Sequence, residues 1–213
     1  MRLKGFSHRL GVVALYDRYL AARVRRRSSL PEHIALIITE RDLLDQEAFE
    51  RLEAFLRWSI AYEADRVTVY VSVLDTAVIP ALRRGLQELA SPVPIAIRDP
   101  GDADRATAPS QIGIGLGGKH ELATAVAGVA NEVKRGELSP NEIDESDIEG
   151  RLVFPDEPDL VIKTGAERLS DFMIWQSVYS ELYFTDVNWQ NFRRRDFLRA
   201  LLEYTRRSRR YGR

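Results

Sequence analysis

The chain has 213 residues, of which 45% are hydrophobic and 30% are charged. This composition supports a folded core and one domain, and it argues against intrinsic disorder. The absence of cysteine excludes disulfide scaffolds, thiolate metal sites and cysteine nucleophiles. No apolar run approaches the roughly 20 residues of a membrane-spanning helix, and no signal-peptide pattern opens the chain. We therefore expect a cytoplasmic protein.

The net charge of -1 conceals two basic ends and an acidic middle. Residues 1–30 carry eight basic and one acidic side chain, residues 193–213 carry nine and two, and residues 31–192 carry 14 and 29. All but four of the basic residues are arginine, whose planar guanidinium binds phosphate oxygens in pairs. The bias is compatible with phosphate chemistry and equally with the base composition of the gene.

The first 30 residues are predicted to form a basic amphipathic helix or arm that precedes the domain of residues 31–213. Four apolar residues recur there at helical spacing, namely Leu10, Val13, Leu20 and Val24. Two interpretations of this helix stay open. Its apolar stripe could pack against the body of the protein, or the helix could lie on an anionic membrane.

Strands alternate with helices in the remainder of the chain. Aliphatic and β-branched runs predict five strands, at residues 34–38, 66–73, 93–98, 111–116 and 159–163. Helical spacing predicts a helix capped by Asp45, helices at 79–89, 121–135, 172–179 and 195–207, and a short acidic helix within 139–152. The alternation predicts a single-domain α/β fold with a mostly parallel central β-sheet flanked by helices.

Ligands of open α/β sheets bind beyond the carboxyl ends of the strands, and one such end carries a phosphate-like pattern. Lys163, Gly165, Arg168 and Ser170 follow the last predicted strand and precede a predicted helix. Backbone N–H groups and two cations there would suit a phosphate. The alternative is an ordinary loop in which Ser170 caps the helix.

Two other strand ends carry weaker signals. The segment Gly115–His120 lacks P-loop spacing and is more typical of a structural turn. A carboxylate of Glu40 or Asp42 could hold Mg²⁺, but a solvated turn is the better interpretation. The histidines have no metal-ligand spacing, and the three tryptophans are interpreted as core residues; these are His8, His33, His120, Trp58, Trp175 and Trp189.

The stretch from Asp159 to Asp186 resembles the C-terminal signature of the cis-prenyltransferases, the undecaprenyl and dehydrodolichyl diphosphate synthases. It contains Lys-Thr-Gly-Ala-Glu-Arg-Leu-Ser-Asp-Phe at 163–172 and Glu-Leu-Tyr-Phe-Thr-Asp at 181–186. Further matches are Trp189, Phe192, the pair Gly117-Gly118 and the closing Arg209-Arg210-Tyr211-Gly212. The resemblance implies the undecaprenyl diphosphate synthase fold and a role in making polyprenyl diphosphates, the precursors of dolichol- and undecaprenol-type lipid carriers.

The resemblance also implies a set of site residues. Arg168 and Ser170 would bind the diphosphate of isopentenyl diphosphate, together with Lys163, which stands where the family has an arginine. Glu181 matches a carboxylate that helps to coordinate Mg²⁺ shared with the substrate diphosphate. Arg210 and Gly212 match an Arg-x-Gly tail that, in the family, reaches across a dimer interface into the partner's active site.

Two departures from the family pattern concern the allylic starter. The segment Thr39–Leu43 replaces an Asp-Gly-Asn-Gly-Arg motif that binds Mg²⁺ and the allylic diphosphate. No catalytic residue is expected at Thr39, and Glu40 and Asp42 are the substitutes available. The segment Ser72–Leu116 is much shorter than the family's, whose long helices wall the product tunnel, so we expect little tunnel here.

These departures are similar to those of the non-catalytic, Nogo-B-receptor-like subunits of heteromeric cis-prenyltransferases. The leading hypothesis is a catalytically impaired accessory subunit that completes the isopentenyl diphosphate site of an active partner, peripheral at a membrane. The alternative is an active prenyltransferase that condenses isopentenyl diphosphate with an allylic diphosphate at a non-standard Mg²⁺ site. A homodimer and a heterodimer with an active family member both stay open. A nucleic-acid-binding module is a third class, but the chain has no recognition motif for it.

Overall fold

A six-stranded parallel sheet forms the centre of the computed structural model, which describes residues 4–102, 104–165 and 173–207, with side chains from residue 14 onward. The strand order is β3-β4-β2-β1-β5-β6, and every pairing between neighbours is parallel. The strands are β1 (His33–Thr39), β2 (Arg66–Ser72), β3 (Ile95–Arg98), β4 (Ser110–Ile114), β5 (Leu160–Thr164) and β6 (Glu181–Thr185). The predicted single-domain α/β fold with a parallel sheet is confirmed.

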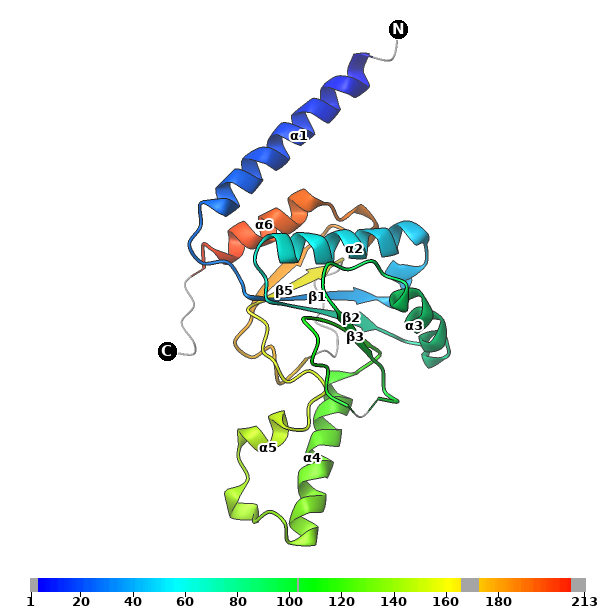
Figure 1. Cartoon of the computed structure of the whole chain (residues 1–213), viewed down its shortest axis with the longest axis vertical. Coiled ribbons are helices and arrows are strands. Elements are labelled where there is room, and N and C mark those ends of the chain that lie inside the picture. Colours follow the sequence, from blue (N-terminus) through cyan, green and yellow to red (C-terminus); the bar gives the residue numbers. More distant parts are fainter. Residues whose placement is uncertain (1–3, 103, 166–172, 208–213) are drawn as a thin grey trace.

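Helices cover both faces of this sheet unequally. They are α1 (Lys4–Arg25), α2 (Gln46–Ala61), α3 (Ile79–Gln87), α4 (Gly118–Arg135), α5 (Glu145–Glu149) and α6 (Arg194–Tyr204). Figure 1 shows α2 and α6 against one face, with α1 beyond them, while α4 and α5 extend from the other side. The larger hydrophobic core accordingly lies between the sheet and the α2–α6 layer.

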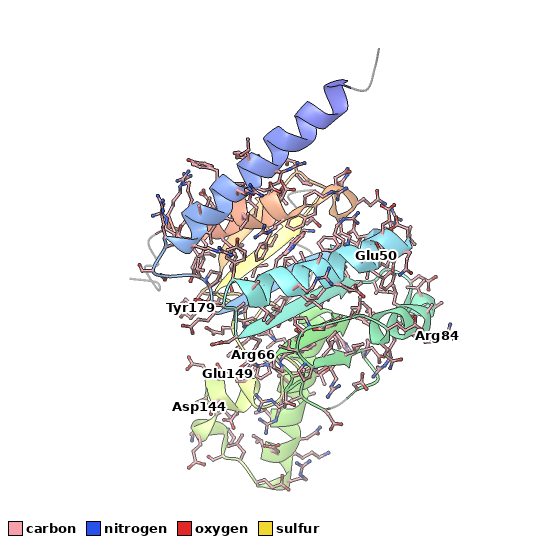
Figure 2. All side chains as sticks on the ribbon, turned by 45° about the horizontal axis from the view of Figure 1, so that its top comes forward. Glu50, Arg66, Arg84, Asp144, Glu149 and Tyr179 are labelled. Carbon is pink, nitrogen blue, oxygen red and sulfur yellow. The ribbon has the colours of Figure 1, made fainter. Side chains whose placement is uncertain are left out.

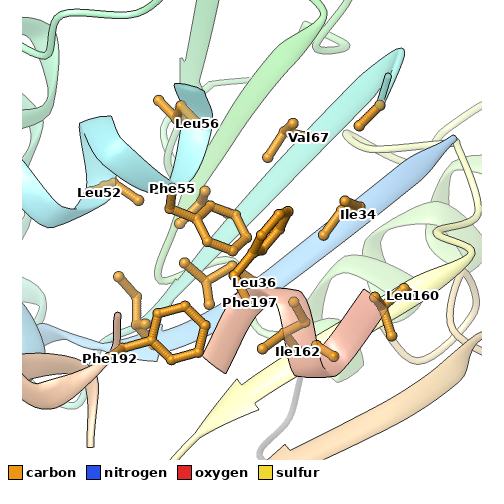
Figure 3. Packing of buried hydrophobic residues seen from close by; sticks show 14 of the residues in the cluster. Ile34, Leu36, Leu52, Phe55, Leu56, Val67, Leu160, Ile162, Phe192 and Phe197 are labelled. Carbon is orange, nitrogen blue, oxygen red and sulfur yellow. The ribbon is translucent and has the colours of Figure 1, made fainter. Parts of the chain in front are cut away.

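An aromatic cluster joins α2 to the segment that follows β6 (Figure 3). The ring of Phe55 packs edge-on against Phe197 at 5.5 Å and against Trp189 at 6.3 Å between centroids. The Trp189 indole N–H donates to the carbonyl of Ala48 at 3.3 Å. Buried aromatic pairs of this kind add stability beyond their buried area, so residues 187–192 are held firmly beside the end of β5.

The structure differs from the sequence expectation in two places. A sixth strand, β6, forms one lateral edge of the sheet, where the sequence predicts no strand. Residues 172–179 were predicted to be a helix, but the described part, 173–179, consists of turns with one helical-type bond, from the N–H of Ser177 to the carbonyl of Met173. The predicted helix cap is confirmed, because Asp45 accepts from the N–H of Ala48 at 2.8 Å.

The C-terminal half of α1 packs on the domain. Leu20, Ala21 and Val24 are buried, and the helix contacts α6. Of the two interpretations of the N-terminal helix, packing is therefore observed for this part of the stripe. No helix of the described residues combines the length and the apolarity needed to cross a membrane.

His33 anchors the amino end of β1 through a buried polar contact. Its side chain is 7% exposed, with Nδ1 3.1 Å from the carbonyl oxygen of Glu157 and Nε2 2.8 Å from the Thr68 hydroxyl. A carbonyl oxygen can only accept, so Nδ1 carries the proton and Nε2 accepts from Thr68. Burial lowers the pKa of His33 from 6.5 to about 4. The expectation of a structural histidine is confirmed.

Protonation of His33 should destabilise the fold. Because its pKa is lower in the folded state than the unfolded value of 6.5, the unfolded state binds more protons between these two values. The free energy of unfolding should therefore fall by up to about 3 kcal/mol as the pH decreases from 6.5 towards 4. Urea unfolding across this window measures the loss. A His33→Gln variant should show a flatter profile, and the same slope in that variant would contradict the assignment.

Candidate functional site

The carboxyl ends of the parallel strands meet at one edge of the sheet, where the strand register brings the candidate residues together. Thr39 of β1 lies opposite Ser72 of β2. Lys163 of β5 lies between Ile37 of β1 and Phe184 of β6. The ends of β1 and β5, which carry the two candidate segments of the sequence, are therefore neighbours in space.

Lys163 is a nearly buried cation at this edge. Its side chain is 8% exposed, and burial lowers the pKa of its ammonium group, an effect that the charge of Asp42 opposes. Within the described residues, no carboxylate oxygen comes within 4.0 Å of this ammonium group. Because desolvation disfavours an uncompensated charge, the site favours the binding of an anion beside Lys163.

The two residues after Lys163 shape the turn that would receive such an anion. Gly165 has φ +78°, a conformation that other residues adopt only with strain, and its N–H donates to the carbonyl of Val187 at 3.3 Å. The hydroxyl oxygen of Thr164 is buried and has no hydrogen-bond partner among the described residues. Buried polar atoms normally have partners, so Thr164 offers an unused hydroxyl at the same edge.

Four of the predicted substrate-binding residues lie outside the described residues. They are Arg168, Ser170, Arg210 and Gly212. Their roles stay predictions from the family resemblance.

Side-chain hydrogen bonds hold the turn that follows β1. The Asp42 carboxylate accepts from both the N–H and the hydroxyl of Thr39, each at 2.8 Å. The Glu40 carboxylate accepts from the N–H groups of Leu74 at 2.9 Å and Asp75 at 3.4 Å. The segment Glu40–Leu43 forms a short 3₁₀ turn, as the sequence predicted, and both carboxylates serve to hold it in place.

This arrangement fits poorly with a magnesium ion held by side chains. Mg²⁺ demands a near-ideal octahedral set of oxygen ligands. In the described parts of the chain, no three histidine or acidic side chains gather in a way that could hold a metal. The carboxylates of Glu40 and Asp42 are directed to separate backbone groups instead.

Glu181 lies at the amino ends of the strands, whereas Lys163 lies near their carboxyl ends. Glu181 begins β6 and pairs with Leu160, the first residue of β5, and its carboxylate accepts from the Arg207 guanidinium at 3.1 Å. Four residues of strand place it about 13 Å from the level of Thr164. A metal role for Glu181 at Lys163 would thus need a second subunit, and within one chain the structure does not bring the two together.

An apolar cavity beside the β1 turn was not expected from the sequence. It has a volume of about 490 Å³, within the range of small-molecule sites. Its lining includes Leu43, Leu44, Phe49, Val78 and Leu82, with Glu40 at its rim. The cavity lies where Phe49 of α2 meets Leu82 and Gly85 of α3, and the expectation of little product tunnel stays a prediction. The two consecutive leucines Leu43 and Leu44 are the sequence feature that could have indicated this cavity.

The remaining candidates have structural roles or none that is visible. Gly115 turns the chain after β4 with φ +66°, as predicted for a structural turn. The Glu121 carboxylate in the first turn of α4 accepts from the Val153 N–H at 2.8 Å and the Gln176 amide at 3.2 Å. Trp189 is fully buried, whereas Trp175 is partly exposed.

The carboxyl ends of the strands thus carry a buried lysine and a left-handed glycine at the end of β5 and, separately, an apolar cavity beside the turn after β1. The model of the undecaprenyl diphosphate synthase family (Prenyltransf) matches residues 97–212. The chain is 31% identical to the tritrans,polycis-undecaprenyl-diphosphate synthase (geranylgeranyl-diphosphate specific) of Methanopyrus kandleri, over 95% of this chain and 92% of the relative. The chain belongs to this family, the cis-prenyltransferases.

Other known proteins are similar to this chain. The synthase of the same name from Methanocaldococcus jannaschii is 52% identical over 107 residues, which span 47% of this chain but only 38% of that relative. The crystal structure of lavandulyl diphosphate synthase from Lavandula x intermedia in complex with dimethylallyl diphosphate has a TM-score of 0.71. At 24% identity, over 86% of this chain and 99% of that one, it shows the shared fold.

The chain is shorter than its relative from Methanopyrus kandleri. The alignment extends over 251 positions but uses 95% of a 213-residue chain, or about 202 residues. At least about 49 positions of the relative, the difference between these two values, therefore have no counterpart here.

Removal of the Glu40 carboxylate should loosen the contact between the turns after β1 and β2. Glu40→Ala leaves two backbone N–H groups without their acceptor and should lower the free energy of unfolding by about 1 kcal/mol. Glu40→Gln keeps an acceptor oxygen and should cost less. Urea unfolding of both variants tests this role. A Mg²⁺-dependent stabilisation that Glu40→Gln abolishes would instead assign Glu40 to a metal.

Proposed function

We propose that this chain is a cis-prenyltransferase subunit of polyprenyl diphosphate synthesis that binds isopentenyl diphosphate and relies on a partner of the same family to activate the allylic substrate. The observation that carries the proposal is the closed turn after β1. There Thr39 occupies the family's aspartate position, and the nearby carboxylates accept from backbone N–H groups and the Thr39 hydroxyl.

The proposed isopentenyl diphosphate site consists of Lys163 and the turn at Gly165, with Arg168 and Ser170 added from the family resemblance. The desolvated Lys163 ammonium would gain a counter-charge from the diphosphate. Lysine is a compact charge without the fork geometry of the family's arginine. We therefore infer that binding at this position depends on charge more than on a bidentate contact.

The allylic substrate needs more than binding, because its diphosphate must leave as the carbon–oxygen bond breaks. Preorganised donors and metal ions aimed at the departing charge lower that barrier. Here Leu43 stands at the position of the family's arginine, and Glu40 and Asp42 add negative charge. Loss of even one such donor typically costs about 10²–10³ in rate, so the lone chain should be nearly inactive.

A partner subunit would supply the groups that activate the allylic diphosphate, and this chain would supply its C-terminal tail to the partner. The tail residues Arg210 and Gly212 are proposed to complete the diphosphate site of the partner, in a heterodimer or a homodimer. Glu181, at the amino edge of the sheet, could reach a diphosphate only across such an interface. Any Mg²⁺ would then be shared with the substrate diphosphate, and the complex would work in the cytoplasm at a membrane surface.

A reconstitution assay tests this function. The purified chain with geranylgeranyl diphosphate, radiolabelled isopentenyl diphosphate and Mg²⁺ should incorporate almost no label. Addition of a family member that keeps the Asp-Gly-Asn motif should raise the activity of that member at least tenfold. Arg210→Ala should abolish the rise, whereas the control Arg206→Ala, at an exposed residue paired with Glu203, should preserve it. Robust turnover by the lone chain would contradict the accessory role.

The apolar cavity favours a second candidate, a prenyltransferase that is active alone and makes a short product. In that case the prenyl tail of the allylic substrate would occupy the space between Leu43, Phe49 and Leu82.

A cavity-filling variant separates the two candidates. Ala81 lines the cavity, whereas Arg84 on the same helix does not and is exposed. If the lone chain is active, Ala81→Trp should lower its turnover or shorten its product, and Arg84→Trp should do neither. Equal turnover in both variants would exclude this cavity as the tail site.

A further inference from the structure

The exposed face of α1 is unlike the buried one. Leu20 and Val24 are covered by the domain, whereas Leu15 is 64% exposed and Tyr19 54%. Tyr16 lies between the two faces, because Arg199 of α6 stacks over its ring at 5.5 Å. Leu15 and Tyr19 are four residues apart and form one ridge along the helix. Two apolar surfaces thus run along the same helix, and the domain covers only one of them.

This ridge is bordered by arginines that have almost no acidic neighbours on the helix. From residue 14 onward, where side chains are described, the arginines of the helix and of the turn after it are Arg18, Arg23, Arg25, Arg26 and Arg27, of which all but Arg23 are exposed. Arg23 stacks over the ring of Tyr19 at 5.6 Å. Asp17 is the single acidic residue among residues 1–30, and one of its carboxylate oxygens is buried. The exposed face therefore carries a strong positive charge.

The position of α1 leaves this face accessible. Figure 1 shows the helix extending away from the domain towards its N-terminal end. The acidic α5 region, with Asp144 and Glu149, lies at the other end of the molecule (Figures 1 and 2). An anionic surface would attract the first end and repel the second, and so it would orient the whole molecule.

We propose that the Leu15–Tyr19 ridge with its flanking arginines is a docking surface for an anionic lipid bilayer. Tyrosine is enriched at the depth of lipid headgroups, and leucine gains from burial just below them. Arginine can lay its apolar stem along the interface while its guanidinium contacts lipid phosphates. The lipid-facing side is thus not the stripe expected from the sequence, because α6 already covers Leu20 and Val24. This inference does not depend on catalysis by the chain.

Vesicle co-sedimentation of the full chain tests the proposal. Vesicles of phosphatidylglycerol and phosphatidylcholine should bind the protein at low ionic strength, and vesicles of phosphatidylcholine alone should not. Each arginine near an anionic surface contributes roughly fivefold to the affinity. The variant R25Q/R26Q/R27Q should therefore bind the anionic vesicles roughly 100-fold more weakly, and Leu15→Asp should also weaken binding.

A matched control removes the same charge elsewhere. The variant R57Q/R84Q/R135Q changes three exposed arginines on α2, α3 and α4 and should bind within about twofold of the unchanged chain. If both triple variants lose the same affinity for anionic vesicles, the effect is one of net charge alone and the proposal is overturned. Absence of binding to anionic vesicles by the unchanged chain would also overturn it. If Leu15→Asp instead dissociates an oligomer in light scattering while vesicle binding persists, the ridge is a protein interface and the proposal fails.

Discussion

The hydrogen bonds that close the turn after β1 determine how the rest of this edge can be used. Asp42 accepts from Thr39, and Glu40 joins this turn to the one after β2. A carboxylate engaged in this way stabilises a loop at the point where the family resemblance implies a diphosphate cradle. A second anion placed there would face the carboxylates of Glu40 and Asp42 beside the exposed Arg41, without the glycine backbone that the family motif implies.

The neighbouring strand end has the opposite character. Lys163 is desolvated, Thr164 has an unused hydroxyl, and Gly165 turns the backbone away with a left-handed φ. The parallel register of β1 and β5 places these two environments side by side. One chain therefore carries a buried cation at the end of β5 beside a turn at the end of β1 whose carboxylates are already engaged in hydrogen bonds.

The sequence was sufficient for the parallel fold because β1, β2 and β5 are nearly continuous aliphatic or β-branched runs, which only a sheet buried on both faces requires. It was insufficient for β6, since Glu181–Thr185 is a short edge strand whose pairing with β5 is a tertiary interaction. It also failed for residues 173–179, where helical spacing of apolar residues was overridden by packing of Met173 and Gln176 into the core. The cavity beside Leu43 depends on how α3 packs against α2, and no local pattern encodes that tertiary contact.

For the site, residue types predicted the charges but not their partners. The positions of Lys163 and Asp42 followed from the strand ends, whereas the bonds from Thr39 to Asp42 and from Leu74 to Glu40 depend on loop geometry.

The most direct test of the account is the equilibrium binding of isopentenyl diphosphate to the lone chain. We expect measurable binding that Lys163→Ala weakens at least tenfold and Lys163→Arg preserves. Absence of binding, or equal binding by Lys163→Ala, would contradict the account.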